Sequence, residues 1–231
     1  MPFAFTQGAA IGKDENVLKE MMGAKKILSE IEGRRYLEKV RQWAKQKSVT
    51  AQRILNTIDI YPHPIYLVTM VGGLTCFDNE PSPGGVIYMD VSIHSSVRPG
   101  GALGVHGNFE IQHPFVAFLH ECGHAVQNIE NPSQFVNSSK GPLSLLSADI
   151  ATAARQRGDR LFSHMKYAER RVWFSSNGSV TGQPWSVRLE YDNIYRHERP
   201  ICIESGEPMR DHYLDFNTNW SCIQYIDHYN R

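Results

Sequence analysis

One stretch of the chain, from His113 to Asn128, constrains the fold more than any other. Pro114 suits the first turn of a helix, where a backbone N–H has no partner within the helix. The apolar residues that follow have the three- and four-residue spacing of a single buried stripe: Phe115, Phe118, Leu119, Cys122, Ala125, Val126 and Ile129. The pattern therefore predicts a helix over this stretch, packed into the core along one side.

The same stretch carries a possible metal site. His120 and His124 are one helical turn apart, so both imidazoles project from the same side and can bind one ion. Glu121 lies beside them, where its carboxylate can take a proton from a water on that ion. This His-Glu-x-x-His spacing is typical of zinc metallopeptidases. Because an apolar helix needs a reason to carry three such polar residues, we interpret the motif as a zinc site. The alternative is a surface edge of the helix on which these side chains hydrogen-bond to one another.

The size and charge of the chain exclude several other classes of protein. Its 231 residues suffice for one domain with a sizeable core. The formal charge is zero at pH 7, which leaves no basic surplus for binding nucleic acid. No apolar run approaches the length of a membrane span, and the first residues lack the pattern of a secretory signal peptide. We expect neither nucleic acid nor a membrane span.

Cysteine usage points to a reducing compartment. The four cysteines, at positions 76, 122, 202 and 222, form no Cys-x-x-Cys pair, so a cysteine-ligated zinc is not expected. The sequence offers no test of a disulfide between Cys202 and Cys222. We interpret all four as reduced thiols, which is consistent with folding in a cytosol or delivery to one.

The chain before the motif combines helices and strands. Apolar spacing predicts a helix from Asp14, its cap, to about Trp43, with Gly33 as a break or a dent. A further short helix is expected at 51–60. Branched and aromatic residues predict strands at 65–71 and 86–93, hence a small sheet whose edge can pair with an extended peptide.

The segments beside and after the motif leave the remaining metal ligand open. Residues 97–112 are expected to form a loop; His106 within it, and His94 and His113 beside it, are possible ligands. Helices are predicted at 144–154 and 160–173. A catalytic zinc needs a third protein ligand and an open position for water. Spacing does not choose among the acidic residues downstream, which are Glu130, Asp149, Asp159, Glu169, Glu190 and Asp192. Glu130, however, is too near the motif helix to fold back easily onto the metal.

Three separate motifs together resemble one family. The motif His120–His124, then Glu169-Arg170-Arg171-Val172, then the segment from Glu204 to Tyr213 are similar to the NleD-type effector metallopeptidases. These are bacterial effector and toxin domains, related in their sites to clostridial neurotoxin light chains. The resemblance implies Glu169 as the third zinc ligand, in a Glu-x-Arg setting. It also implies that Arg210 and Tyr213, from an Arg-x-x-Tyr motif, face the scissile carbonyl.

The chain departs from this family at three points. The segment 192–196 resembles a further family segment, but Asp192 stands where the family usually has Glu. Ala168 stands where the family often has a second acid, and the usual glycines after Val172 are missing. These departures bear on the third ligand, so Asp149, Glu190 and Asp192 stay open beside Glu169.

Motif and resemblance together predict an α+β, zincin-like metallopeptidase with a small sheet packed on the motif helix. Residues 1–60 would be an N-terminal helical region of the same unit, and 61–231 the metallopeptidase domain. The expected function is a zinc-dependent endopeptidase. By resemblance it is a secreted effector or toxin, delivered by a specialised secretion system into the cytosol of a target cell to cleave host or target-cell signalling proteins. The alternatives are a zinc hydrolase of the producing cell and a non-catalytic, zinc-stabilised binding module.

Overall fold

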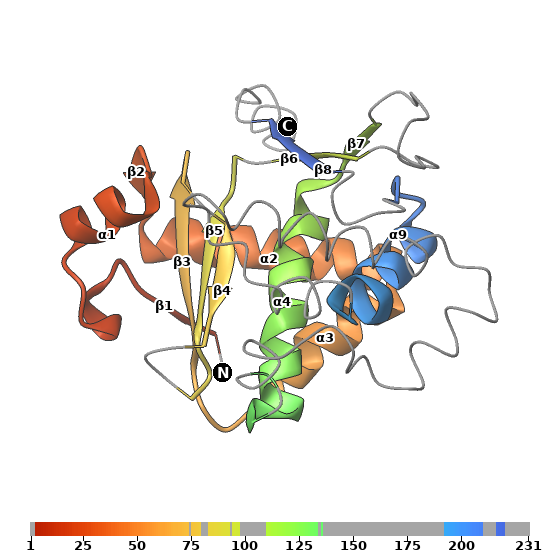
Figure 1. Ribbon diagram of the computed structural model, residues 1–231, viewed down its shortest axis with the longest axis horizontal. Helices are drawn as coiled ribbons and strands as arrows, with labels where there is room; N and C mark the ends of the chain where they lie inside the picture. The colour runs from red at the N-terminus through yellow and green to blue at the C-terminus, as the bar shows by residue number, and fades with distance from the viewer. Residues whose placement is uncertain are drawn as a thin grey trace, which may run out of the picture.

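The computed structural model describes residues 3–73, 75–79, 83–92, 94–97, 110–133, 135, 192–209 and 216–219. Helices and strands are mixed in this part of the chain, which confirms the expected α+β class (Figure 1). The helices are α1 (Glu15–Met22), α2 (Glu30–Lys47), α3 (Val49–Ile60), α4 (Pro114–Glu130) and α9 (Arg199–Ser205), with a 3₁₀ turn η1 (Ala9–Ile11) and a π-helical segment η4 (Ile194–Glu198). The strands are β1 (Phe3–Phe5), β2 (Lys26–Ile27), β3 (Ile65–Val71), β4 (Cys76–Asp78), β5 (Val86–Asp90), β6 (His94–Val97), β7 (Glu110–Gln112) and β8 (Phe216–Asn219). None of the described helices combines the length and apolar character needed to cross a bilayer.

The larger sheet is built around β3, and its strand order is β1-β3-β5-β4. β1 and β5 run parallel to β3, whereas β4 pairs antiparallel with β5 and lies at the edge. The predicted strand at 65–71 is confirmed. The second predicted strand ends early, at Asp90, because the Asp90 carboxylate accepts a hydrogen bond from the Ser92 N–H, 2.9 Å away, and so forms a turn.

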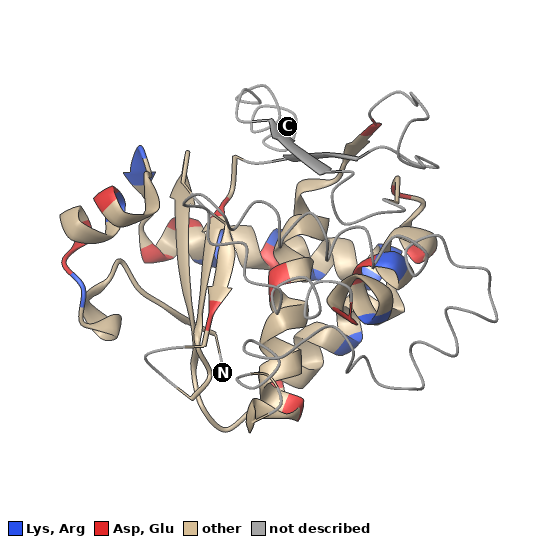
Figure 2. Cartoon of the chain, viewed as in Figure 1, with Lys and Arg blue, Asp and Glu red and all other residues tan. Residues whose placement is uncertain are grey.

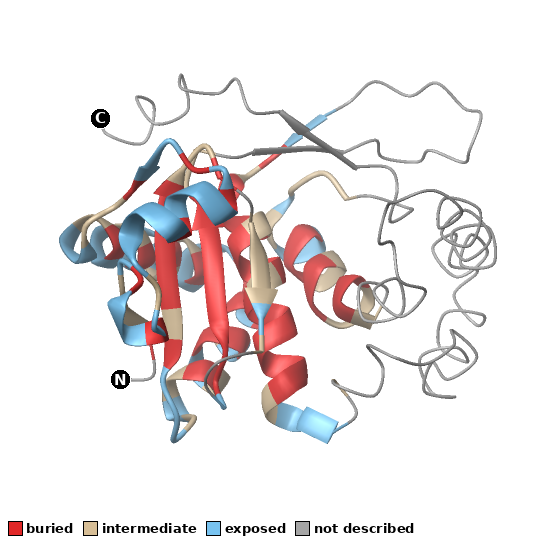
Figure 3. Ribbon diagram, turned by 60° about the vertical axis from the view of Figure 1, so that its left-hand side comes forward, coloured by how far each residue is buried: buried red, intermediate tan, exposed pale blue. Residues whose placement is uncertain are grey.

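Helices cover both faces of this sheet (Figures 1 and 3). Alternate residues of β3 and β5 point to opposite faces. Leu67, Ile87 and Met89 pack into one hydrophobic cluster with α2, α3 and α4, whereas Val68 and Tyr88 pack into a second cluster with α1. Burial on both faces explains why β3 is an almost continuous apolar run rather than an alternating one.

The predicted N-terminal helix is two helices, and of the two roles expected for Gly33, a break or a dent, the break is wrong. Asp14 caps α1 as expected, with its side chain accepting a hydrogen bond from the Asn16 N–H. The helix ends at Gly23, whose φ of 64° is left-handed. A new helix begins after Ser29, which forms a capping box with Glu32. Gly33 lies inside α2, where an added Cβ would be 2.8 Å from the Phe5 ring.

The prediction of a loop at 97–112 is wrong for its last three residues. Residues 110–112 form β7, which pairs antiparallel with β6, and β6 pairs on its other side with β8. The three strands make a second, smaller sheet, seen above the N-terminal end of α4 in Figure 1. Because β8 is far away in the chain, local patterning around 94–97 and 110–112 gave no sign of this pairing.

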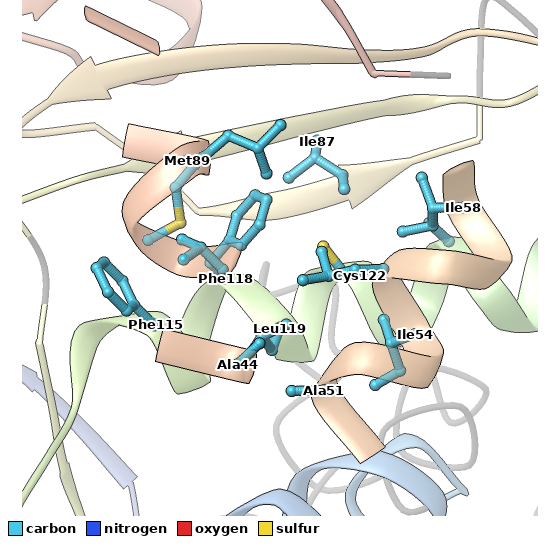
Figure 4. Packing of buried hydrophobic residues seen from close by; sticks show 14 of the residues in the cluster. Ala44, Ala51, Ile54, Ile58, Ile87, Met89, Phe115, Phe118, Leu119 and Cys122 are labelled. Carbon is cyan, nitrogen blue, oxygen red and sulfur yellow. The ribbon is translucent and has the colours of Figure 1, made fainter. Parts of the chain in front are cut away.

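The motif helix α4 lies at the centre of the larger hydrophobic cluster. Six residues of its predicted apolar stripe are buried, and Ile129 is half-buried. Figure 4 shows four of them, Phe115, Phe118, Leu119 and Cys122, among side chains of the sheet and of α2 and α3. In the described part of the chain Cys76, Cys122 and Cys202 form no disulfide, and Sγ of Cys202 accepts a hydrogen bond from Nε2 of Gln112 at 3.2 Å. Cys222 lies outside that part.

Candidate metal site

The structure brings the two motif histidines together. His120 and His124 project from successive turns of α4, and their ring centroids are 4.9 Å apart with the ring planes almost perpendicular. Both residues are buried, with exposed fractions of 8% and 7%. His120 faces η4, because its ring bonds to Glu198 of that segment. Phe118 and Cys122 pack on the sheet side of α4 (Figure 4). The two rings thus lie close together, as the spacing of the motif predicts.

A buried carboxylate holds the first ring. The Oε2 atom of Glu198, at the end of η4, is 2.8 Å from Nδ1 of His120. Glu198 itself is 3% exposed. A carboxylate bonded to the second ring nitrogen of a histidine is the usual support of a zinc ligand. The contact thus fits a metal site better than the alternative in which the histidines bond only to one another.

The second ring is held through an amide. Oε1 of Gln127 lies 2.8 Å from Nδ1 of His124, and Nε2 of Gln127 donates to Oδ2 of Asp192 at 2.6 Å. Asp192 also lies 3.6 Å from the guanidinium of Arg196. Figure 2 shows that acidic and basic residues are mixed along η4 and α9, the elements that follow Asp192. Residues 192–198 thus support both rings, His120 directly through Glu198 and His124 through Gln127.

This segment packs tightly on α4 because the motif contains a glycine. Nδ2 of Asn193 donates to the backbone carbonyl of His120 at 2.8 Å. A Cβ added at Gly123 would lie only 2.0 Å from Oδ1 of Asn193. Asn193 is fully buried, so it has little room to move away.

Replacing Gly123 with alanine is expected to lower the free energy of unfolding by about 1–3 kcal/mol, the usual cost of overpacking. At an open helical position, replacing glycine with alanine raises the free energy of unfolding. A decrease at Gly123 would therefore point to overpacking as the cause. Urea denaturation of Gly123→Ala measures it. In a double variant that also carries Asn193→Ala, Gly123→Ala should lower the free energy of unfolding by less, because the clashing side chain is absent. A Gly123→Ala protein as stable as the parent would contradict the packing.

Glu121 lies within electrostatic reach of the edge strand β4. It is half-buried. Burial, together with the negative charge of Glu121, raises the pKa of the Cys76 thiol on β4 to about 12. Since β4 is the edge of the sheet, the expected general base lies near the strand edge that the sequence suggested for peptide pairing.

Several predicted site residues lie outside the described part of the chain. They are Glu169, Arg210, Tyr213, Asp149 and Glu190. Asp192 is described, and its carboxylate bonds to Gln127 and Arg196. Within the described residues, no three His, Cys, Asp or Glu side chains are grouped closely enough to hold an ion. The prediction that Glu169 is the third ligand therefore stays a prediction.

The three flanking histidines have separate outcomes. His113 caps α4, because its Nδ1 accepts a hydrogen bond from the Phe115 N–H at 3.2 Å. Its ring packs on Trp43, and burial lowers its pKa to about 4. His94 begins β6, and His106 lies outside the described residues.

Sequence reasoning missed the helix that supports the site. Five of its buried residues, Ile194, His197, Glu198, Ile201 and Cys202, follow the same three- and four-residue spacing as α4. Pro200 hid this signal, because proline normally ends a helical pattern. Here Pro200 lies in the first turn of α9, directly after the π-helical segment, where the Arg199 N–H donates to the carbonyl of Ile194. π-Helical segments are frequent at functional sites.

Comparison with known proteins finds no matching family model, no matching curated protein and no matching solved structure. The resemblance to the NleD-type effector metallopeptidases is therefore a prediction from the motifs alone.

Proposed function

We propose that the chain is a zinc-dependent endopeptidase with a zincin-like fold. One observation carries the proposal: two buried histidines face each other from adjacent turns of α4, and each has its Nδ1 bonded to a partner outside the pair. Histidines that served only to satisfy one another would not need Glu198 and Gln127. Paired imidazoles with such support are the donor set that zinc takes in peptidases.

The proposed ligands are His120, His124 and Glu169. Glu169 is the first choice for the third ligand because of the motif resemblance. Asp192 ranks below it, since its carboxylate already bonds to the Gln127 amide. When bound, zinc would lower the pKa of a coordinated water and polarise the peptide carbonyl.

The residues of the chain have separate roles in the proposed hydrolysis. Glu121 takes a proton from the attacking water and passes it to the leaving amine. Arg210 and Tyr213 donate hydrogen bonds to the oxyanion that develops on the carbonyl oxygen. An extended peptide pairs with β4, so that its backbone lies beside Glu121. Because backbone pairing does not depend on side-chain identity, the substrate class is protein.

Replacing Tyr213 with phenylalanine is expected to lower turnover by about 10- to 1000-fold, because one oxyanion donor is lost. Zinc content and the unfolding midpoint should stay at parent values. Tyr61→Phe is the matched control: its hydroxyl bonds to the Pro83 carbonyl away from the site, so turnover should not change. Equal turnover of Tyr213→Phe and the parent would remove Tyr213 from the mechanism.

Zinc content and proteolysis together test the function. Metal-free protein is titrated with zinc, and the loaded protein is then assayed on casein and a peptide library. One equivalent of zinc with cleavage supports the proposal, whereas zinc binding without turnover favours the binding module. New N-termini in a lysate treated with loaded protein would identify the substrates.

The biological setting is also proposed from the resemblance. In this view the protein is an effector or toxin that a specialised secretion system delivers into the cytosol of a target cell. Its substrates there would be host or target-cell signalling proteins. A zinc peptidase of the producing cell is the competing setting, and dependence of its export on a secretion system separates the two.

A further inference from the structure

The partner of His120 can only accept hydrogen bonds. An ionised carboxylate has no proton to donate. The 2.8 Å contact between Glu198 and Nδ1 of His120 therefore requires the hydrogen to be on Nδ1. The lone pair of the ring is then on Nε2. Burial of both residues keeps water from replacing this contact.

The partner of His124 is ambiguous by itself, because an amide can donate or accept. The hydrogen bond between Gln127 and Asp192 shows which way the amide is oriented. The carboxylate of Asp192 only accepts, so the NH₂ group of Gln127 must point toward it, at 2.6 Å. Oε1 of Gln127 then faces Nδ1 of His124 and accepts its hydrogen. The lone pair of this ring is also on Nε2.

The tautomers of both rings depend on one segment, residues 192–198. Asp192 and Glu198 flank Asn193, which bonds to the backbone of α4 at His120, and the missing side chain of Gly123 allows this close approach. The segment is thus placed by backbone contacts as well as by the ring contacts. Its two carboxylates act on rings that lie one turn apart.

We infer that Glu198 and Asp192 are positioning residues that hold His120 and His124 in the tautomer whose Nε2 binds metal. Glu198 acts directly on its ring, and Asp192 acts through Gln127. The inference rests on the proposed zinc site and deepens it. It also explains why the Gln127 amide is itself bonded to a carboxylate, since an amide alone would permit either tautomer.

The first test uses metal-free protein with ¹⁵N-labelled histidine. Long-range ¹H–¹⁵N correlation spectra report which ring nitrogen carries the hydrogen, and His120→Asn and His124→Asn assign the signals. In the parent both rings should be protonated at Nδ1. In Glu198→Gln the His120 ring should become a mixture of tautomers, and in Asp192→Asn the His124 ring should do so.

The second test measures zinc affinity by competition with a chelating dye. Glu198→Ala should weaken zinc binding by about 10- to 100-fold, the usual effect of losing such a partner. Glu204→Gln is the matched control. Glu204 lies on α9 and accepts hydrogen bonds from Ser48 and Thr50, so its loss destabilises the fold while leaving zinc affinity unchanged.

The outcomes separate this inference from the proposed function. Parent rings protonated at Nε2, or unchanged zinc affinity in Glu198→Ala, would overturn the positioning role. Loss of zinc in Glu198→Gln with an unchanged His120 tautomer would make Glu198 a ligand and would also overturn it. A parent that binds no zinc refutes the proposed function, and the spectra of metal-free protein still decide the tautomers. Glu198→Gln is isosteric, so it serves if the alanine variant does not fold.

Discussion

Glu121→Gln is expected to retain one equivalent of zinc and to lose peptide hydrolysis by about 100- to 10,000-fold, the usual contribution of a general base. Glutamine has the same shape as glutamate, so the half-buried position next to β4 is preserved. Its amide cannot take a proton from water. Initial rates on a fluorogenic peptide, with zinc content measured on the same samples, give the result.

The matched control for this variant is Glu130→Gln. Glu130 lies at the end of the same helix and pairs with Arg196 at its surface, so its replacement should leave turnover unchanged. If Glu121→Gln cleaves as fast as the parent, Glu121 is not the base. If Glu121→Gln loses zinc as well as turnover, Glu121 acts on the metal and not on the water.

Phe118→Ala is expected to lower the free energy of unfolding by about 3–5 kcal/mol, because it opens a cavity in the core. Phe118 is fully buried. Its ring packs edge-on against Tyr36, with centroids 5.6 Å apart, and lies 6.2 Å from the Phe3 ring. The side chain thus joins α4 to α2 and to β1. Urea denaturation in the presence of a chelator measures the loss without a contribution from metal.

The control for the core substitution is Val17→Ala on α1, where the side chain is 58% exposed. This change should alter the free energy of unfolding by less than about 0.5 kcal/mol. A decrease of less than about 1 kcal/mol in the free energy of unfolding of Phe118→Ala would mean that this packing does not stabilise α4.

Local patterns predicted the elements whose structure depends on their own residues. β3 has the bounds expected from its branched residues, and α4 follows from Pro114 and its apolar stripe. The break between α1 and α2 was misplaced because two glycines, Gly23 and Gly33, look alike in sequence. Only Gly23 adopts a left-handed conformation, whereas Gly33 provides space for Phe5.

The supporting residues of the candidate site were not predictable from local patterns. The motif pointed to His120 and His124, but nothing near Glu198 in the sequence indicates that it bonds to a ring 78 residues earlier. Gln127 was within reach of sequence reasoning, since it lies one turn beyond His124 on the same helix. Its role depends on Asp192, whose position is set by tertiary packing.

The separation of these residues along the chain has a consequence for how the protein is made. The larger sheet and α2, α3 and α4 are encoded before residue 131, and N-terminal parts of a chain generally fold first during synthesis. Both carboxylates reach the ribosome exit only later, 65 and 78 residues behind their partners. A nascent chain therefore holds the histidines in a folded framework before either acid arrives, so the proposed metal site would be completed late in translation.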